Sequence, residues 1–146
     1  MRNRVIFLLA PILVLSLLSS CRQGEPLAPQ EPNAVLLTPS NGSTLSAGDV
    51  EVRIYLQNFT MTEDTGQPNR ANEGHAIYYL DVTAPIEAGD PATTAPGTFA
   101  ASTETFYIWQ NVTPGQHVFT VQLVNNDDTP LLPPVSVRAN VVVKNR

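Results

Sequence analysis

Several features that would assign this protein to a class are scarce or missing in its sequence. The 146-residue chain has one cysteine, Cys21, so no intrachain disulfide can form and apolar burial must stabilise the fold. Its eight glycines are spread singly through turns and form no phosphate-binding loop. Eight basic residues stand against 13 acidic ones and form no stripe, so nucleic acid and anionic lipid surfaces are poor partners.

Apolar residues at the amino terminus have the layout of a secretory signal. Arg2 and Arg4 precede an apolar run from Val5 to Leu18, and small residues follow before Cys21. The run is shorter than the roughly 20 helical residues that cross a membrane, and Pro11 interrupts it. We therefore expect residues 1–20 to be a signal peptide that is removed, and not a permanent transmembrane helix.

The segment "LSSC" at 18–21 resembles a bacterial lipobox, and the only cysteine of the chain occupies the cleavage position. The resemblance implies a diacylglycerol thioether on Cys21 and an acylated amino terminus, and durable anchoring requires more than one acyl chain. We therefore expect a lipoprotein of the cell envelope, anchored on the extracytoplasmic side of a membrane. The alternative is a soluble secreted protein with a cysteine at this position by chance.

The mature chain divides into a short stalk and one domain. Residues 21–33 hold Pro26, Pro29 and Pro32 at regular spacing, which favours an extended spacer. Residues 34–146 have the length of a single domain. Loss of the signal removes two of the eight basic residues, so the mature chain has a formal charge of −7. The lipid, and not electrostatic attraction, must therefore supply the membrane contact.

Beyond the stalk, apolar residues alternate with polar ones, which is the pattern of half-buried strands. The alternation is clearest in "DVEVRIYLQNF" (49–59), "HVFTVQLVN" (117–125) and "VSVRANVVV" (135–143), and shorter strands are expected at 34–38, 75–83 and 104–109. Turn sequences such as "TPSNGS" and "TPGQ" separate these runs. The chain is therefore predicted to be all-β, an antiparallel immunoglobulin-like β-sandwich.

One predicted connection is unusually long. Residues 83–103, "TAPIEAGDPATTAPGTFAAST", are rich in alanine, threonine, proline and glycine, and we expect no strand within them. Hairpin loops usually have about 2 to 5 residues, and much longer loops are either functional or flexible. The three prolines of this loop favour an ordered flap.

The two histidines are the candidate metal ligands. His75 begins the strand expected at 75–83, and His117 begins another strand just after a Pro-Gly turn. If both strand beginnings lie at one end of the sandwich, Asp128 on an adjoining loop could complete a weak copper or zinc site. Neither histidine belongs to an H-x-H or H-x-x-x-H pair. The alternative is therefore that both imidazoles bond to turn backbone, with His117 as a rim residue that caps the core.

Longer segments resemble a family of exported prokaryotic β-domains that is largely uncharacterised. The resemblance covers residues 34–143 and is carried by "EGHAIYYLDV", by "WQNVTPGQHVFTVQLVNNDDTPL" and by the final valine strand. The family pattern has G-H-x-H-Y-Y in the first segment and N-N-D-H-T-P at the end of the second. Ile77 and Asp128 replace two of its histidines, so the resemblance implies a site with two of four imidazoles and Asp128 as a substitute oxygen ligand. It implies no enzymatic activity.

Aromatic residues on two predicted strands are candidates for a recognition surface. Neighbouring residues on a strand point to opposite faces, so about half of these rings must lie outside the core. We assign Tyr79, Tyr107 and Trp109 to a possible recognition surface for a protein or a glycan beneath the 83–103 loop. The alternative is that large aromatic side chains fill the core and its edges.

Binding is the class of function that the sequence favours. The chain has no G-x-S-x-G motif, and the mature protein has no free thiol once Cys21 is lipidated. We expect a monomeric, lipid-anchored interaction module without catalysis or cofactor, whose partner is an envelope protein or a glycan. A weak copper or zinc protein that uses His75 and His117 is the alternative, and an envelope hydrolase comes third.

Overall fold

Strands account for the regular secondary structure of residues 30–63 and 66–145, the part of the chain that the computed structural model describes. The nine strands are β1 (Asn33–Thr38), β2 (Thr44–Ser46), β3 (Gly48–Gln57), β4 (Thr60–Met61), β5 (Glu73–Leu80), β6 (Phe99–Ser102), β7 (Phe106–Val112), β8 (Gly115–Val124) and β9 (Pro130–Lys144). Within these residues no helix is long and apolar enough to span a membrane. The expected signal peptide and Cys21 lie outside the described residues.

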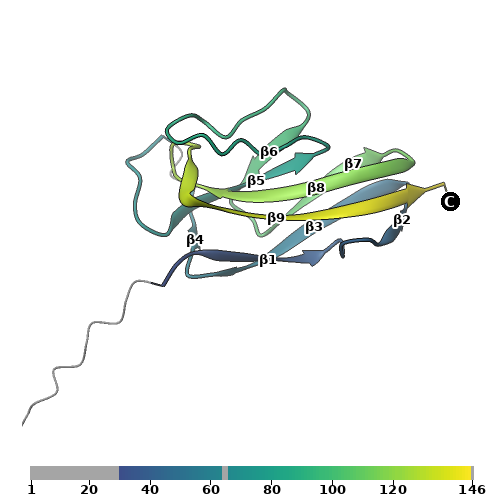
Figure 1. Cartoon of the computed structure of the whole chain (residues 1–146), viewed down its shortest axis with the longest axis horizontal. Helices are drawn as coiled ribbons and strands as arrows, with labels where there is room; N and C mark the ends of the chain where they lie inside the picture. Colours follow the sequence, from purple (N-terminus) through teal and green to yellow (C-terminus); the bar gives the residue numbers. More distant parts are fainter. Residues whose placement is uncertain (1–29, 64–65, 146) are drawn as a thin grey trace, which may run out of the picture.

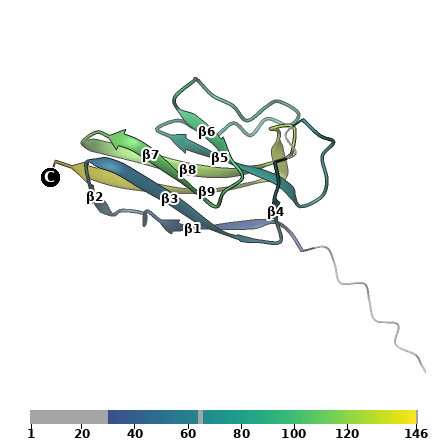
Figure 2. The same cartoon turned by 180° about the vertical axis from the view of Figure 1, so that it is seen from behind.

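The strands form two sheets that lie face to face (Figures 1 and 2). The smaller sheet has the order β1–β3–β7, and the larger has the order β2–β9–β8–β5–β4, with β6 also paired to β5. The runs β1–β3–β7 and β9–β8–β5 are antiparallel, as in the A–B–E and G–F–C strands of an immunoglobulin domain. Only the short pairs β2–β9 and β4–β5 are parallel among the described strands. The predicted immunoglobulin-like β-sandwich is confirmed.

The core lies between the two sheets and follows the alternation of the sequence. Val50, Val52 and Ile54 point inward from β3, and alternate residues of β8 and β9 join them in one buried cluster. Burying each such aliphatic side chain stabilises the fold by about 1.5–3 kcal/mol. Strands with period two therefore supply the stability that disulfides supply in many small secreted domains.

The boundary between the expected stalk and the domain lies earlier than predicted. β1 begins at Asn33, and the two residues at 30 and 31 are already held by the domain. The side-chain amide of Asn58 donates to the carbonyl oxygen of Glu31, and that of Asn72 donates to the carbonyl oxygen of Gln30. The last residues of the expected stalk are thus bonded to the sandwich.

The long connection after β5 differs from the prediction because it contains a strand. β6 pairs with β5 along Ala76–Tyr79, which places four residues of the expected strandless loop in the larger sheet. The residues before β6 run along the outer side of β5 (Figure 1). Ala84 and Ala92 of this segment form one buried cluster with Ile77 and Tyr79 of β5. β5 is therefore buried on both faces, between the core and this covering segment. Four residues are too few for alternation to identify a strand.

Candidate functional site

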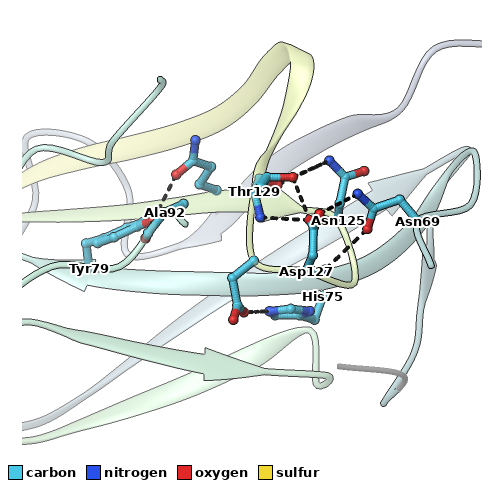
Figure 3. Close-up of polar contacts among 9 residues, drawn as sticks. Asn69, His75, Tyr79, Ala92, Asn125, Asp127 and Thr129 are labelled. Atoms are coloured by element: carbon cyan, nitrogen blue, oxygen red, sulfur yellow. Dashed lines mark hydrogen bonds and ion pairs between the residues drawn. The ribbon is translucent and has the colours of Figure 1, made fainter. Parts of the chain in front are cut away.

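His75 is almost completely buried. It lies near the start of β5 and is 2% exposed, and its Nε2 is 2.8 Å from Oδ1 of Asp128 (Figure 3). An ionised carboxylate can only accept, so Nε2–H of His75 is the donor in this bond. Nδ1 has no hydrogen-bond partner in the described chain. The structure thus brings Asp128 to His75, as expected, but adds no further ligand at the other ring nitrogen.

The loop between β8 and β9 is tied down on both sides of Asp128. Oδ1 of Asp127 accepts hydrogen bonds from the backbone N–H and the hydroxyl of Thr129, and Oδ2 accepts one from the amide of Asn69 (Figure 3). The hydrogen bond from the Thr129 side chain is the main reason why the pKa of Asp127 is lowered. Asn69 also accepts from the backbone N–H of Asp127. These contacts fix the loop and hold Asp128 against His75.

His117 fastens the opposite end of β5 to β8. Its Nδ1 lies 2.7 Å from Oδ2 of Asp81, and its Nε2 lies 2.8 Å from the carbonyl oxygen of Thr113. Oδ1 of Asp81 accepts from the backbone N–H of Val118. Both ring nitrogens face acceptors, an arrangement that the imidazolium form satisfies with two donated bonds. His117 has the contacts of the rim residue that the sequence offered as the alternative.

The expected meeting of the two histidines is wrong. β5 and β8 are antiparallel, with His75 opposite Val124 and Leu80 opposite Phe119. His117 is seven residues from Val124 along β8, which corresponds to roughly 23 Å. Both residues begin strands, but neighbouring antiparallel strands begin at opposite ends of a sheet. The described residues contain no group of three metal-ligating side chains, so His75, His117 and Asp128 form no common site.

The residues around His75 show whether a serine hydroxyl is placed for activation by this histidine. A cavity of about 380 Å³ is lined by His75, Glu63, Ser102 and two adjacent residues. The Ser102 hydroxyl accepts a hydrogen bond from the backbone N–H of Glu104, and Nδ1 of His75 bonds to no hydroxyl in the described chain. A serine nucleophile needs a base within hydrogen-bond reach. The pair of His75 and Asp128 therefore has the contacts of a structural pair.

Two of the three predicted recognition residues are buried. Tyr79 has no exposed surface, and its hydroxyl lies 2.6 Å from the carbonyl oxygen of Ala92 and 2.8 Å from Oε1 of Gln122 (Figure 3). Burial raises the pKa of Tyr79. Trp109 belongs to the main core, and the half-buried Tyr107 packs beside it with ring centroids 5.1 Å apart. The predicted surface is wrong for Tyr79 and Trp109, because the covering segment buries the outer face of β5 and β7 turns Trp109 inward.

The exposed apolar side chains gather instead on the outward side of the smaller sheet. Val35 and Leu37 of β1, Tyr55 of β3 and Ile108 of β7 are each between 43% and 54% exposed. They are four of the seven large apolar side chains that are exposed in the described chain. This surface was not predicted from the sequence. The sequence contains a clue, because residues 34–37 of β1 are all apolar, and side chains of consecutive strand residues point to opposite faces. One apolar face of β1 must therefore point outward.

An ion pair stands at the middle of this surface. The Nε of Arg53 donates to Oε1 of Glu51 at 2.8 Å, and the guanidinium lies over the ring of Phe106, 4.6 Å from its centroid. The hydrogen bond lowers the pKa of Glu51 and raises that of Arg53. Arg53 lies opposite Phe106, and Glu51 lies opposite Ile108, in the register of β3 and β7. Apolar side chains therefore flank one positive and one negative group.

Comparisons with known proteins find structural neighbours and no sequence relatives. No protein-family model matches the chain, and no curated protein matches it. The crystal structure of an engineered protein is similar, with a TM-score of 0.44 and 11% identity. The match covers 80% of this chain and 21% of the engineered protein, so this chain spans about a fifth of the length of that protein. The PKD domain of human KIAA0319 is similar with a TM-score of 0.39 and 19% identity, over 88% of this chain and 94% of that domain. The resemblance to exported prokaryotic β-domains stays a prediction.

Proposed function

We propose that the protein is a lipid-anchored, extracytoplasmic interaction module that binds another protein through the outward side of the smaller sheet. This surface, called the apolar face below, consists of Val35, Leu37, Glu51, Arg53, Tyr55, Phe106 and Ile108. The observation that carries the proposal is the exposure of four large apolar side chains on one side of one sheet. Contiguous apolar surface of this kind marks an interaction site in soluble domains.

The contrast between the two sheets supports this assignment. The outer side of β5 is covered by the chain's own segment, with Ile77 and Tyr79 completely buried. The apolar face has no such cover from the described residues, since Tyr55 remains 54% exposed. A surface that the chain leaves uncovered, beside one that it covers, is explained most simply by a partner.

The chemistry of the apolar face suits a protein better than a glycan. Tyrosine, phenylalanine and arginine are enriched at protein interfaces, and all three occur here. Aliphatic groups such as Val35, Leu37 and Ile108 offer the hydroxyls of a sugar no hydrogen bonds. We therefore assign a protein surface with its own apolar patch as the partner.

The proposed anchor places this surface near a membrane. Eight residues separate Cys21 from Gln30, so a fully extended spacer would reach roughly 30 Å. β1, the strand that follows this spacer, is the edge strand of the smaller sheet. Replacing Cys21 by alanine should move the full chain from the membrane fraction to the soluble fraction, and membrane retention of the variant would contradict the anchor.

The proposed action is binding and not catalysis. Its support is that the buried His75 bonds to Asp128 and reaches no hydroxyl in the described chain. The hydroxyl of Ser102, which lines the same cavity, accepts a hydrogen bond from the backbone N–H of Glu104.

A crosslinking and capture experiment in the native envelope tests the proposed surface. The tagged full chain is compared with a Leu37→Ser/Tyr55→Ser variant, and with a control that carries Ile86→Ser and Leu132→Ser, which are exposed apolar residues elsewhere. A protein captured with the wild type and the control should be lost with the face variant. Equal capture by all three would refute the surface, and a glycan as the lost molecule would refute the assigned partner class.

A further inference from the structure

The ion pair at the centre of the apolar face leaves most of its hydrogen-bonding capacity unused. Arg53 donates to Glu51 through Nε alone, and Glu51 accepts through Oε1 alone. In the described chain no further hydrogen bond or ion pair engages the two terminal nitrogens of Arg53 or the second oxygen of Glu51. Both side chains are about 40% exposed. A guanidinium with a free fork is suited to bind a carboxylate with two parallel hydrogen bonds.

We propose that the protein bound at the apolar face is a second copy of this chain, a proposal that rests on the function proposed above. A two-fold interface uses the same patch on both copies, so the patch must be complementary to itself. The apolar face has this property, because it carries one acid and one base side by side. A two-fold axis through its centre would place Arg53 of each copy against Glu51 of the other.

The apolar side chains are arranged to complete such an interface. On the β1 side Leu37 lies beside Thr38, the residue opposite Arg53, and Val35 lies opposite Tyr55. On the β7 side Phe106 and Ile108 lie opposite Arg53 and Glu51. The two-fold axis that sets Arg53 against Glu51 lies between the two copies and runs perpendicular to β3, so it places β1 of one copy on β1 of the other and β7 on β7. Apolar side chains would therefore meet apolar side chains around the exchanged ion pairs, which is the anatomy of an interface with a buried centre.

The overall charge makes this association weak in solution. Each mature chain has a formal charge of −7, so two copies repel each other at long range. Salt screens this repulsion beyond about 8 Å at physiological ionic strength, while the apolar face itself is neutral through Glu51 and Arg53. Tethering of both copies in one membrane raises their effective concentration. We therefore expect pairs at the membrane, which departs from the monomer expected from the sequence.

Charge reversal offers a test that separates contact from folding. Glu51→Arg alone would set four positive groups together at the two-fold axis, and Arg53→Glu alone would set four negative groups there. Each single variant should lower pairing by about tenfold or more. The two variants expressed together with different tags are complementary, so mixed pairs should form again. A variant that merely misfolds cannot be rescued in this way.

Pairing is read by a reporter cysteine in the membrane-bound full chain. Ile108 lies opposite Glu51 and therefore close to the proposed axis, so Ile108→Cys treated with a short bismaleimide should give a crosslinked dimer. The exposed control Ile86→Cys should give at least about tenfold less. The wild type, whose single cysteine is Cys21, gives the background of crosslinking from that residue. Equal crosslinking at both positions, or no mixed pairs from the complementary variants, overturns the second copy as the partner. If the wild type captures a different protein in the capture experiment and the Leu37→Ser/Tyr55→Ser variant does not, the proposed function stands and only the second copy is refuted as the partner.

Discussion

Gly74 offers the sharpest test of the pairing between β5 and β8. A Cβ atom added at Gly74 would overlap the carbonyl oxygen of Val124 and lie 3.2 Å from the Cα of Asn125, both backbone atoms that cannot rotate away. The φ angle of Gly74 is +157°, which side chains also disfavour. The two strands would have to separate by more than about 1 Å at the register point of His75 and Val124.

Gly74→Ala should therefore destabilise the fold by about 3 kcal/mol, the size of an overpacked core site together with backbone strain. For a domain of this length that corresponds to a fall of roughly 10–15 °C in Tm. Gly97→Ala is the matched control, because Gly97 has a φ of +84° but open space around its Cβ position. The control carries strain without overlap and should cost about 1 kcal/mol. Thermal unfolding followed by circular dichroism compares them, and equal Tm values for the two variants would refute the tight strand contact.

Three further predictions follow from the buried polar groups and the histidines. Tyr79→Phe should lower the free energy of unfolding by about 1–3 kcal/mol in chemical denaturation, because it removes a buried hydroxyl whose single hydrogen is donated to one of two nearby buried acceptors. Tyr107→Phe should have a smaller effect. In the fold, the pKa of Asp127 is lowered below its ordinary value of 3.8. The hydrogen bonds from Thr129 to the ionised carboxylate therefore stabilise the protein above pH 3.8. The difference in stability between the wild type and Asp127→Asn should disappear as the pH falls below the pKa of the folded state. A similar loss at pH 2 and pH 6 would contradict this. Copper or zinc should change the Tm of the wild type and of His75→Ala equally, and stabilisation that requires His75 would show that a metal site exists.

The alternation of apolar residues was enough to predict the sandwich, because a half-buried strand needs it. The run from Val50 to Ile54 is observed as part of β3, with its apolar residues in the core. β6 escaped prediction because it is short and because alanine carries little information about which face is buried. Tyr79 was assigned to the surface for a related reason: alternation shows that two faces differ, but a covering segment can bury both.

The candidate site depended on which strands are neighbours, and sequence does not supply that. His75 and His117 each follow a turn, but their strands pair antiparallel and separate them by the length of the pair. His75 and Asp128 are 53 residues apart and meet because the β8–β9 loop folds back over the start of β5. The apolar face was missed because only the assembled sheet shows that side chains of β1, β3 and β7 share one side.

The change of sheet between β1 and β2 has a mechanical consequence. β1 pairs with β3 in the smaller sheet, and β2 then pairs in parallel with the end of β9, with Thr44 opposite Val142 and Ser46 opposite Lys144 (Figure 2). A pull on residue 43, just before β2, against residue 145 would draw β2 and β9 in opposite directions along their common axis. The hydrogen bonds between them would be loaded together in shear, and not opened one after another as in a zipper. The first strands to carry force are thus the ones that lock the two ends of the domain together.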